Sequence, residues 1–188
     1  MTAPSQPGGV PLLSGQSVLI TGGSGSLGHA LTRYLLDHQD PRRVLIYSRD
    51  EWKQSVMADT FGDARLRFVL GDVRDRDRLT YCMGGVNVVI HAAALKRVDA
   101  IAYNPTEVLL TNVMGTHQVC MASIAARVGQ VLTISSDKAV HPSNMYGCTK
   151  QMAEHITVGA NVGGVPRGTR LACVRYGNVL GSRGSVIQ

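Results

Sequence analysis

The chain has 188 residues, of which 44% are hydrophobic and 17% are charged, and this length can bury one α/β core but is too short for two full domains. The formal net charge of +6 comes from basic residues that are scattered along the chain and interleaved with acidic ones. Because Phe and Trp are also scarce, we expect no nucleic-acid-binding surface.

The N-terminal segment 1–15 contains Pro and Gly but neither a basic stretch nor a long apolar run. We therefore predict a flexible segment, not a signal peptide or a transmembrane helix, and a cytoplasmic protein without membrane insertion. The cysteines at 82, 120, 148 and 173 lie far apart and form no CxxC pair. Reduced, buried thiols are expected, with no metal site.

Apolar, β-branched runs alternate with segments of helical periodicity along residues 16–188, the pattern of a parallel sheet with crossover helices. Strands are predicted at 17–21, 43–47, 67–70, 86–91, 131–135 and 171–175. Helices are predicted at 27–37, 51–61, 76–83, 107–127 and 146–158. Gly and Pro mark the connections, among them 163–166, and 179–185 is predicted to be a loop. The fold class is α/β, a Rossmann-type doubly wound parallel sheet with helices on both faces.

A glycine-rich turn, Thr21-Gly22-Gly23-Ser24-Gly25-Ser26-Leu27-Gly28, follows the first strand and precedes an amphipathic run. A dinucleotide pyrophosphate requires a turn without Cβ atoms, followed by a helix whose free N–H groups face the anion. A flexible Gly/Ser turn is the alternative, but the strand before it and the helix after it favour phosphate binding. The residues expected at the phosphates are Gly22, Ser24, Gly25, Ser26, Leu27 and Gly28.

The end of the second strand indicates the cofactor, because an acidic residue there usually binds the ribose hydroxyls of NAD. Ser48 and Arg49 occupy this place, and both can bind a 2′-phosphate, so NADP is predicted over NAD. The alternative is that Asp50 supplies the acid from a shifted register. Asp72 and Val73, after the third strand, are predicted to receive the adenine, although Asp72 could instead cap the next helix.

Small residues follow the fourth strand, in the run His91 to Lys96, and would let a flat ring lie against the backbone at Ala92, Ala93 and Ala94. Packing alone is the alternative reading of these alanines. After the fifth strand come Asp137-Lys138 and then Tyr146 and Lys150, whose i, i+4 spacing places them on one helical face. An adjacent ammonium favours a phenolate, which can take a proton from a sugar hydroxyl.

These motifs resemble the extended short-chain dehydrogenase/reductase family and, within it, the inverting UDP-N-acetylglucosamine 4,6-dehydratases. The segments that carry the likeness are the glycine-rich turn, Tyr47 to Glu51, Gly71 to Asp75, His91 to Lys96, Ser136 to Ala139, Tyr146 to Lys150, Arg175 to Val179 and Gly181 to Ser185. The turn and the Tyr-Lys pair specify only the superfamily, whereas the Ser-Arg-Asp-Glu and Asp-Lys-Ala segments indicate the dehydratase group.

The resemblance implies a tightly bound NADP that is reduced and reoxidised in each turnover. Tyr146 would deprotonate the C4 hydroxyl, and Lys150 would hold the ribose and lower the pKa of the tyrosine. Lys138 would remove the C5 proton, and Asp137 would protonate the departing C6 hydroxyl. Retaining sugar dehydratases carry Glu beside the Asp, so Lys138 is the residue on which the inverting assignment depends. The intact tyrosine favours the pseudaminic-acid-type branch.

Other residues take their roles from the same resemblance. Lys96 and Asn178 would face the UDP-sugar, or else be a surface charge and a turn former, and Asn112 would support the active-site helix. His91 and His141 are interpreted as non-catalytic. Family members associate through helices flanking the sheet, which implies a homo-oligomer. They also continue beyond the position of Gln188 into a C-terminal substrate region, which is largely absent here.

Two other functions remain open from the sequence. An epimerase or reductase with the same Tyr-Lys pair would not release water, and the Asp-Lys pair argues against it. A non-catalytic NADP-binding module is the third possibility, which the intact Tyr146 and Lys150 oppose.

Overall fold

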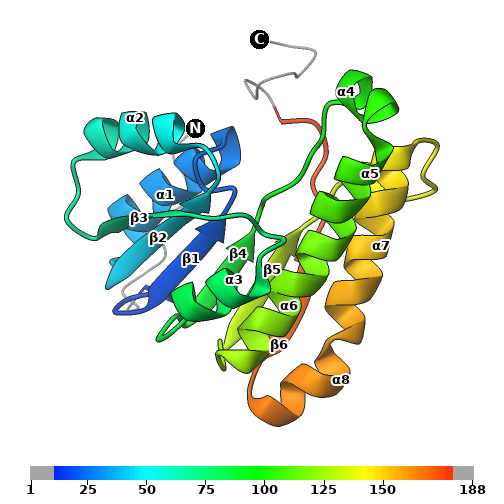
Figure 1. The fold of residues 1–188 in the computed structure, drawn as a ribbon. Coiled ribbons are helices and arrows are strands. Elements are labelled where there is room, and N and C mark those ends of the chain that lie inside the picture. The colour runs from blue at the N-terminus through cyan, green and yellow to red at the C-terminus, as the bar shows by residue number, and fades with distance from the viewer. Residues whose placement is uncertain (1–10, 180–188) are drawn as a thin grey trace.

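The structure is a computed structural model that describes residues 11–179, and its core is one six-stranded parallel sheet (Figure 1). The strand order is β3-β2-β1-β4-β5-β6, and all neighbours are parallel. The order reverses beside β1, which is the switch point of a doubly wound sheet. The strands are β1 (Ser17–Thr21), β2 (Arg43–Ser48), β3 (Leu66–Leu70), β4 (Val88–His91), β5 (Gln130–Ile134) and β6 (Arg170–Val174).

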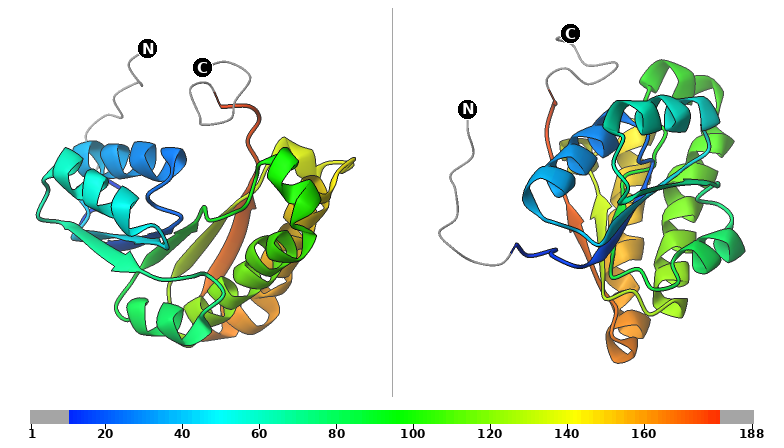
Figure 2. Two further views of the ribbon diagram at one scale, coloured as in Figure 1. Left: turned by 45° about the horizontal axis from the view of Figure 1, so that its top comes forward. Right: turned by 90° about the vertical axis from the view of Figure 1, so that its left-hand side faces the viewer.

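Helices connect the strands and lie on both faces of the sheet, as the sequence predicted (Figure 2). They are α1 (Ser26–His38), α2 (Glu51–Phe61), α3 (Arg76–Cys82), α4 (Val98–Tyr103), α5 (Pro105–Val108), α6 (Gly115–Ala125), α7 (Met145–Gly159) and α8 (Asn161–Gly164). A π-helical stretch, η1 (Leu109–Met114), joins α5 to α6, and two short 3₁₀ turns, η2 (Asp137–Ala139) and η3 (Val165–Arg167), complete the described chain.

The two faces of the sheet have separate apolar cores, because side chains alternate along each strand. Val18, Ile20 and Ile46 face the layer of α1 and α2, where Leu35 of α1 packs against them. The opposite side chains, among them Leu19, Tyr47, Val89, Val131 and Leu171, pack against α6, which lies beside α3 and α7. Strands covered on both faces must be apolar along their length, which explains the uninterrupted hydrophobic runs in the sequence.

Three helical segments differ from the predictions. The segment 163–166 was predicted to be a connection, but it contains the end of α8 and the start of η3. Pro166 fits there because it stands in the first turn of η3, where a backbone N–H has no partner within the helix. The predicted helix at 107–127 begins two residues earlier and contains η1. The sequence analysis also missed α4.

Three further predictions concern termini, thiols and membranes. Most of the segment 1–15, predicted to be flexible, and most of the predicted loop 179–185 lie outside the described residues, which are 11–179. Residues 11–15 contain a turn, and Gly15 N donates to Asp40 O over 3.0 Å. Cys148 is exposed, so the expectation of buried thiols is wrong for it. Within the described residues, one helical stretch, 105–125, is apolar and long enough to span a membrane, but 56% of its apolar window is buried inside this fold.

Candidate active site

The predicted site residues gather at the carboxyl ends of the parallel strands, the edge at which doubly wound sheets bind ligands. β1 ends at the glycine-rich turn, β2 ends at Ser48, β4 ends at His91, and β5 leads to η2 and the start of α7. Each motif therefore reaches the site through a strand of the buried sheet, which fixes its position.

The glycine-rich turn has the shape that a pyrophosphate requires. Gly22 has a φ of +66°, and a Cβ there would lie 2.8 Å from the Cα of Ala93. A Cβ on Gly28 would lie 2.0 Å from the carbonyl oxygen of Gly23. The backbone of the turn is thus in close contact with the loop 92–96 at Gly22, and two parts of the turn are in close contact with each other at Gly28. Larger residues do not fit at either position.

The first turn of α1 offers free N–H groups to an anion. The helix starts after Gly25, which provides no side-chain cap, and its first turn contains no acidic residue. By contrast, Asp50, Asp75 and Asn144 cap α2, α3 and α7 with their side chains. The uncapped amides and the positive end of the helix dipole match a phosphate group. Ser26 and Leu27, predicted to bind phosphate, stand in this turn.

Ser24 and Ser48 link the turn to the end of β2. The hydroxyl of Ser24 donates to Ser48 Oγ over 2.9 Å, and Gln54 Nε2 donates to the same oxygen over 2.9 Å. Ser48 Oγ therefore accepts two hydrogen bonds, and its own proton can point to a ligand. Gln54 Nε2 donates its second proton to the carbonyl oxygen of Val69 over 2.9 Å, which ties α2 to β2 and β3. The sequence analysis did not single out this residue.

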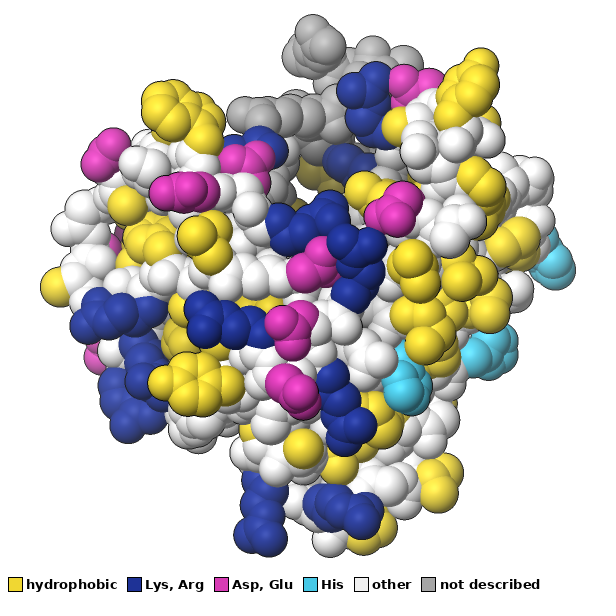
Figure 3. All heavy atoms as spheres, viewed as in Figure 1, with side chains coloured by type: hydrophobic (Ala, Val, Ile, Leu, Met, Phe, Trp, Pro, Cys, Tyr) yellow, Lys and Arg dark blue, Asp and Glu magenta, His cyan; other side chains and the backbone are white. Residues whose placement is uncertain are grey.

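Charged side chains form a network next to Ser48. Basic and acidic side chains lie side by side over the middle of the face shown in Figure 3. Asp72 Oδ2 accepts from Arg49 Nη1 over 3.4 Å and from Arg74 Nη2 over 2.7 Å, and Arg74 Nη1 contacts Glu107 Oε2 over 3.0 Å. Arg74 keeps the pKa of Asp72 below its usual value, against the opposing effect of partial burial. The Arg49 side chain is 52% exposed.

The structure distinguishes the alternatives for two acids. Asp50 caps α2 by accepting from Lys53 N over 3.0 Å and also pairs with the Lys53 ammonium. Asp72 is not a helix cap, because α3 is capped by Asp75. Val73, next to Asp72, is 5% exposed and packs where a Cβ on Gly115 would lie, so its side chain belongs to the core.

Asn112 holds the loop that follows β4. Its Oδ1 accepts from Leu95 N over 2.8 Å, and its Nδ2 donates to Leu95 O over 2.9 Å and to Thr149 Oγ1 over 3.1 Å. Asn112 is buried within the π-helical stretch, where the wider helix places its side chain between the loop and α7. Ala92, Ala93 and Ala94 are partly exposed, and Lys96 is exposed.

Tyr146 and Lys150 lie on one face of α7, and both are buried, at 7% exposed each. Burial raises the pKa of Tyr146 to about 12, with a further contribution from Tyr176, while the hydroxyl of Ser136 opposes the shift. Burial lowers the pKa of Lys150 to about 8, and Lys150 Nζ donates to Ile134 O over 2.7 Å. The Lys150 ammonium is thus hydrogen-bonded to the last residue of β5, and the Tyr146 phenol is neutral at pH 7.

Asp137 and Lys138 form an exposed pair near Tyr146. Lys138 Nζ lies 3.1 Å from Asp137 Oδ1 and 3.3 Å from Asn178 Oδ1. Ser136, which the sequence analysis did not single out, donates from Oγ to Asp137 Oδ1 over 2.8 Å. This hydroxyl and then Lys138 lower the pKa of the Asp137 carboxyl. The structure therefore brings the predicted residues 137, 138 and 178 into one cluster at the site edge.

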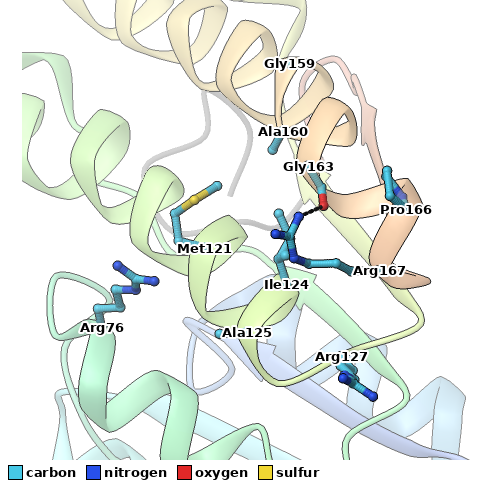
Figure 4. Close-up of a pocket in the computed structure, with 10 residues that line it drawn as sticks. All are labelled: Arg76, Met121, Ile124, Ala125, Arg127, Gly159, Ala160, Gly163, Pro166 and Arg167. Atoms are coloured by element: carbon cyan, nitrogen blue, oxygen red, sulfur yellow. Dashed lines mark hydrogen bonds between the residues drawn. The ribbon is translucent and has the colours of Figure 1, made fainter.

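A groove of about 860 Å³ lies at the carboxyl ends of α6 and α7, away from Tyr146 at the start of α7 (Figure 4). Met121 and Ile124 line it together with Arg127 and Arg167, and Arg167 Nη1 donates to Gly163 O over 2.8 Å. None of the predicted site residues lines this groove. Among the described residues, no cluster of His, Cys, Asp and Glu forms a candidate metal site.

Comparisons with known proteins agree with this geometry. The family model described as polysaccharide biosynthesis protein matches residues 18–188. A UDP-N-acetylglucosamine 4,6-dehydratase (inverting) from Campylobacter jejuni is 44% identical over 94% of this chain and 53% of its own length. A UDP-glucose 4-epimerase from Rickettsia prowazekii is 41% identical over 92% of this chain and 51% of its own. The chain spans about half the length of these relatives.

Solved structures show the same fold. The X-ray structure of Pen from Bacillus thuringiensis superposes with a TM-score of 0.89 at 39% identity, covering 93% of this chain and 54% of that one. The dTDP-glucose 4,6-dehydratase DesIV from Streptomyces venezuelae, solved with NAD and TYD bound, gives a TM-score of 0.75 at 25% identity, covering 85% and 55%. The sheet, the site and these likenesses lead to one conclusion: the chain belongs to the polysaccharide biosynthesis protein family, within the extended short-chain dehydrogenases/reductases.

Proposed function

We propose that the chain carries the cofactor site and catalytic residues of an NADP-dependent nucleotide-sugar 4,6-dehydratase, a lyase that acts on UDP-N-acetylglucosamine and inverts C5. The observation that carries the proposal is the exposed Asp137–Lys138 pair, held at 3.1 Å at the site edge near buried Tyr146. Hydride transfer alone needs the tyrosine, whereas loss of water needs a second base and an acid. The similarity to the Campylobacter jejuni dehydratase also supports a dehydratase function.

NADP is proposed as the cofactor because Ser48 and Arg49 stand at the end of β2, where an acid would bind the ribose of NAD. Asp50 caps α2, whereas Arg49 is half exposed and Ser48 has a proton to donate. The uncapped first turn of α1 suits the pyrophosphate. When bound, NADP would supply a hydride acceptor and one positive charge on its oxidised ring.

Tyr146 is proposed as the base for the C4 hydroxyl. Its pKa of about 12 in this form means that it needs a nearby positive charge before it can act near neutral pH. Lys150 is buried on the same face of α7, and its hydrogen bond to Ile134 O orients its ammonium group. A ribose hydroxyl beside Lys150 would accept another hydrogen bond from this ammonium. Both residues are buried on this face of α7, and burial limits the positions that their side chains can take.

Asp137 and Lys138 are proposed to act as a proton-sharing pair. In this form the carboxyl is ionised, because its pKa is lowered by Ser136 and Lys138. Transfer of one proton from Lys138 Nζ to Asp137 would yield a neutral amine and a neutral carboxyl together. The amine can then take the C5 proton, and the carboxyl can give its proton to the departing C6 hydroxyl, so that one water is lost.

The remaining proposals concern the surroundings of the reaction. The UDP-sugar would contact Lys96, which is exposed after β4, and Asn178, which contacts Lys138. The protein is proposed to be a cytoplasmic homo-oligomer without membrane insertion or nucleic-acid binding.

The experiment is incubation of the protein with UDP-N-acetylglucosamine and NADP in D₂O, with product mass and proton NMR as readouts. A 4,6-dehydratase releases one water and incorporates solvent deuterium at C5, which is inverted. Lys138→Ala should abolish both signals while NADP binding persists. Product without loss of water would contradict the proposal.

An epimerase is the second candidate, because the Rickettsia relatives are named UDP-glucose 4-epimerase at 41–43% identity. An epimerase would interconvert the C4 epimers of the sugar without losing water, without deuterium at C5 and without dependence on Lys138. The same incubation therefore separates the two functions.

A further inference from the structure

His91 is a buried histidine at the carboxyl end of β4, and the proposed chemistry does not use it. It is 2% exposed, and in the sheet its register partners are Thr21 of β1 and Thr133 of β5. Its Nδ1 lies 2.7 Å from Thr21 Oγ1, and its Nε2 lies 3.0 Å from Thr116 Oγ1 of α6. Both ring nitrogens thus have short hydrogen bonds to threonine hydroxyls.

The direction of these hydrogen bonds follows from Thr116. Its hydroxyl donates its one proton to the carbonyl oxygen of Asn112 over 2.6 Å, since a carbonyl can only accept. Thr116 Oγ1 must therefore accept from His91, which places the imidazole proton on Nε2. Nδ1 is then the acceptor of a hydrogen bond from the Thr21 hydroxyl. Burial, with a further contribution from Lys150, lowers the pKa of His91 to about 3, which agrees with a neutral ring.

The hydrogen-bonded chain begins and ends on the same loop. At one end Ala93 N donates to Thr21 Oγ1 over 3.4 Å. At the other end Asn112 accepts from and donates to the backbone of Leu95. The intervening bonds pass through His91 and Thr116 to the backbone carbonyl of Asn112, whose side-chain amide then makes the bonds to Leu95. The loop 92–96 is thus held at two points, and His91 connects the first of them to the backbone of the residue that makes the second.

This loop is in contact with the phosphate turn and is connected to α7. A Cβ on Gly22 would meet Ala93 at 2.8 Å, so the loop and the turn are already as close as backbones allow. Asn112 Nδ2 also donates to Thr149 Oγ1, and that hydroxyl donates to Tyr146 O over 2.8 Å. A shift of the loop would therefore change both the wall of the cofactor site and the support of Tyr146.

We propose that His91, as the neutral tautomer protonated on Nε2, is a positioning residue that fixes the loop 92–96 for cofactor binding through Thr21 on one side and Thr116 and Asn112 on the other. The inference deepens the proposed function and rests on the dinucleotide site proposed there. It assigns a role to a histidine that the sequence analysis interpreted as non-catalytic.

The test compares two buried threonines of the same kind. Thr116→Val removes the acceptor of the Nε2 proton and leaves that proton buried and unpaired, whereas Thr116→Ser restores the hydroxyl. Thr157→Val is the matched control, because Thr157 is fully buried in α7, donates to Ala153 O and contacts Thr133 Oγ1, and it makes none of the hydrogen bonds that hold the loop 92–96. All three are made in the 188-residue chain.

Two measurements follow. The first is ¹⁵N NMR of protein labelled at histidine, at pH 7, with the His91 signals assigned by their loss in His91→Gln. The wild type should show one protonated and one bare ring nitrogen, with Nε2 protonated. The second is NADP affinity by titration calorimetry. We expect the dissociation constant to rise about tenfold in Thr116→Val, because a loop that holds the binding position only about one tenth of the time weakens the apparent affinity by that factor. It should remain within about twofold in Thr116→Ser and Thr157→Val.

The outcomes separate the two proposals. Protonation on Nδ1, or equal weakening of NADP binding by Thr116→Val and Thr157→Val, would overturn the role of His91. Unchanged affinity in Thr116→Val would do the same, with the dinucleotide site left intact. If the folded wild type binds neither NADP nor NAD, the proposed function fails at its cofactor, and the role of the loop fails with it.

Discussion

Arg175 and Glu154 form a two-point ion pair, in which Arg175 Nε and Nη2 donate to the two carboxylate oxygens over 2.8 and 2.6 Å. Glu154 stands on α7 one turn after Lys150, and Arg175 follows β6 directly. The pair therefore connects the helix that carries Tyr146, the proposed base, to the segment that leads to Asn178. The carboxylate side chain is only 12% exposed, so it depends on this partner.

Arg175→Met should lower the free energy of unfolding at pH 7 by about 1–3 kcal/mol, because it leaves a nearly buried carboxylate unpaired. Arg170→Met is the matched control at the exposed start of β6, with an expected change within about 0.5 kcal/mol. Urea unfolding at pH 7 measures both. Equal stabilities for the two variants would show that the ion pair contributes nothing.

The same pair predicts a pH dependence. Arg175 holds the pKa of Glu154 below the ordinary value of 4.5, so the folded state binds this proton less readily than the unfolded state. The stabilisation is therefore complete above pH 4.5 and is lost as the pH falls through the lower, folded value. The difference in unfolding free energy between wild type and Arg175→Met should shrink in that range. A difference that stays constant down to pH 3 would contradict it.

The sequence was sufficient for those parts of the site that depend on neighbours in the chain. The glycine turn between β1 and α1 and the i, i+4 pair Tyr146 and Lys150 are local patterns, and buried apolar runs revealed all six strands. Contacts between distant segments were not predictable, because they depend on the register of the sheet and the packing of helices. Glu154 with Arg175, 21 residues apart, is one case, and Thr21 with His91, 70 apart, is another.

The errors have local causes. Gly163-Gly164-Val165-Pro166 has the composition of a loop, yet η3 accepts Pro166 in its first turn. The π-helical stretch at Asn112 has no periodicity signal of its own, since it interrupts an otherwise helical pattern. The lowering of the Tyr146 pKa expected from Lys150 does not appear in the structure, where burial raises that pKa and Lys150 donates to the Ile134 carbonyl.

Lys150 should make the protein more stable as the pH rises above 8. Burial lowers its pKa from 10.5 to about 8, so between these values the unfolded state binds more protons than the folded state. Stability then rises with pH, by about 3 kcal/mol in total for one such group. Lys150→Met should lack this rise, although it leaves the Ile134 carbonyl unpaired at every pH. Chemical unfolding from pH 7.5 to 10.5 tests the slope, and parallel curves for wild type and variant would refute the shift.

Arg49 should determine cofactor preference. Arg49→Gln should raise the NADP dissociation constant about 10- to 100-fold, because charge-assisted hydrogen bonds to a phosphate contribute about 1.5–3 kcal/mol. NAD affinity should change little, since NAD lacks the 2′-phosphate. Arg67→Gln on β3 is the control, as its guanidinium donates to Ala64 O and Leu66 O. Calorimetry with both dinucleotides measures the ratio, and an equal loss for NADP and NAD would assign Arg49 a structural role instead.

Gly28 and Gly159 provide a matched pair of helical glycines with opposite surroundings. A Cβ on Gly28 would lie 2.0 Å from Gly23 O, a backbone atom that cannot rotate away, whereas a Cβ on Gly159 meets nothing within 4 Å. Gly28→Ala should therefore force the phosphate turn apart, lower stability by about 1–3 kcal/mol and abolish measurable NADP binding.

Gly159→Ala, in the last turn of α7, should leave NADP binding unchanged and raise stability by about 0.5–1 kcal/mol, because alanine loses less backbone entropy on folding. Thermal unfolding and calorimetry of the two variants decide the point. NADP binding retained by Gly28→Ala would mean that the turn is not the phosphate site, since its backbone could then be displaced without consequence for the ligand.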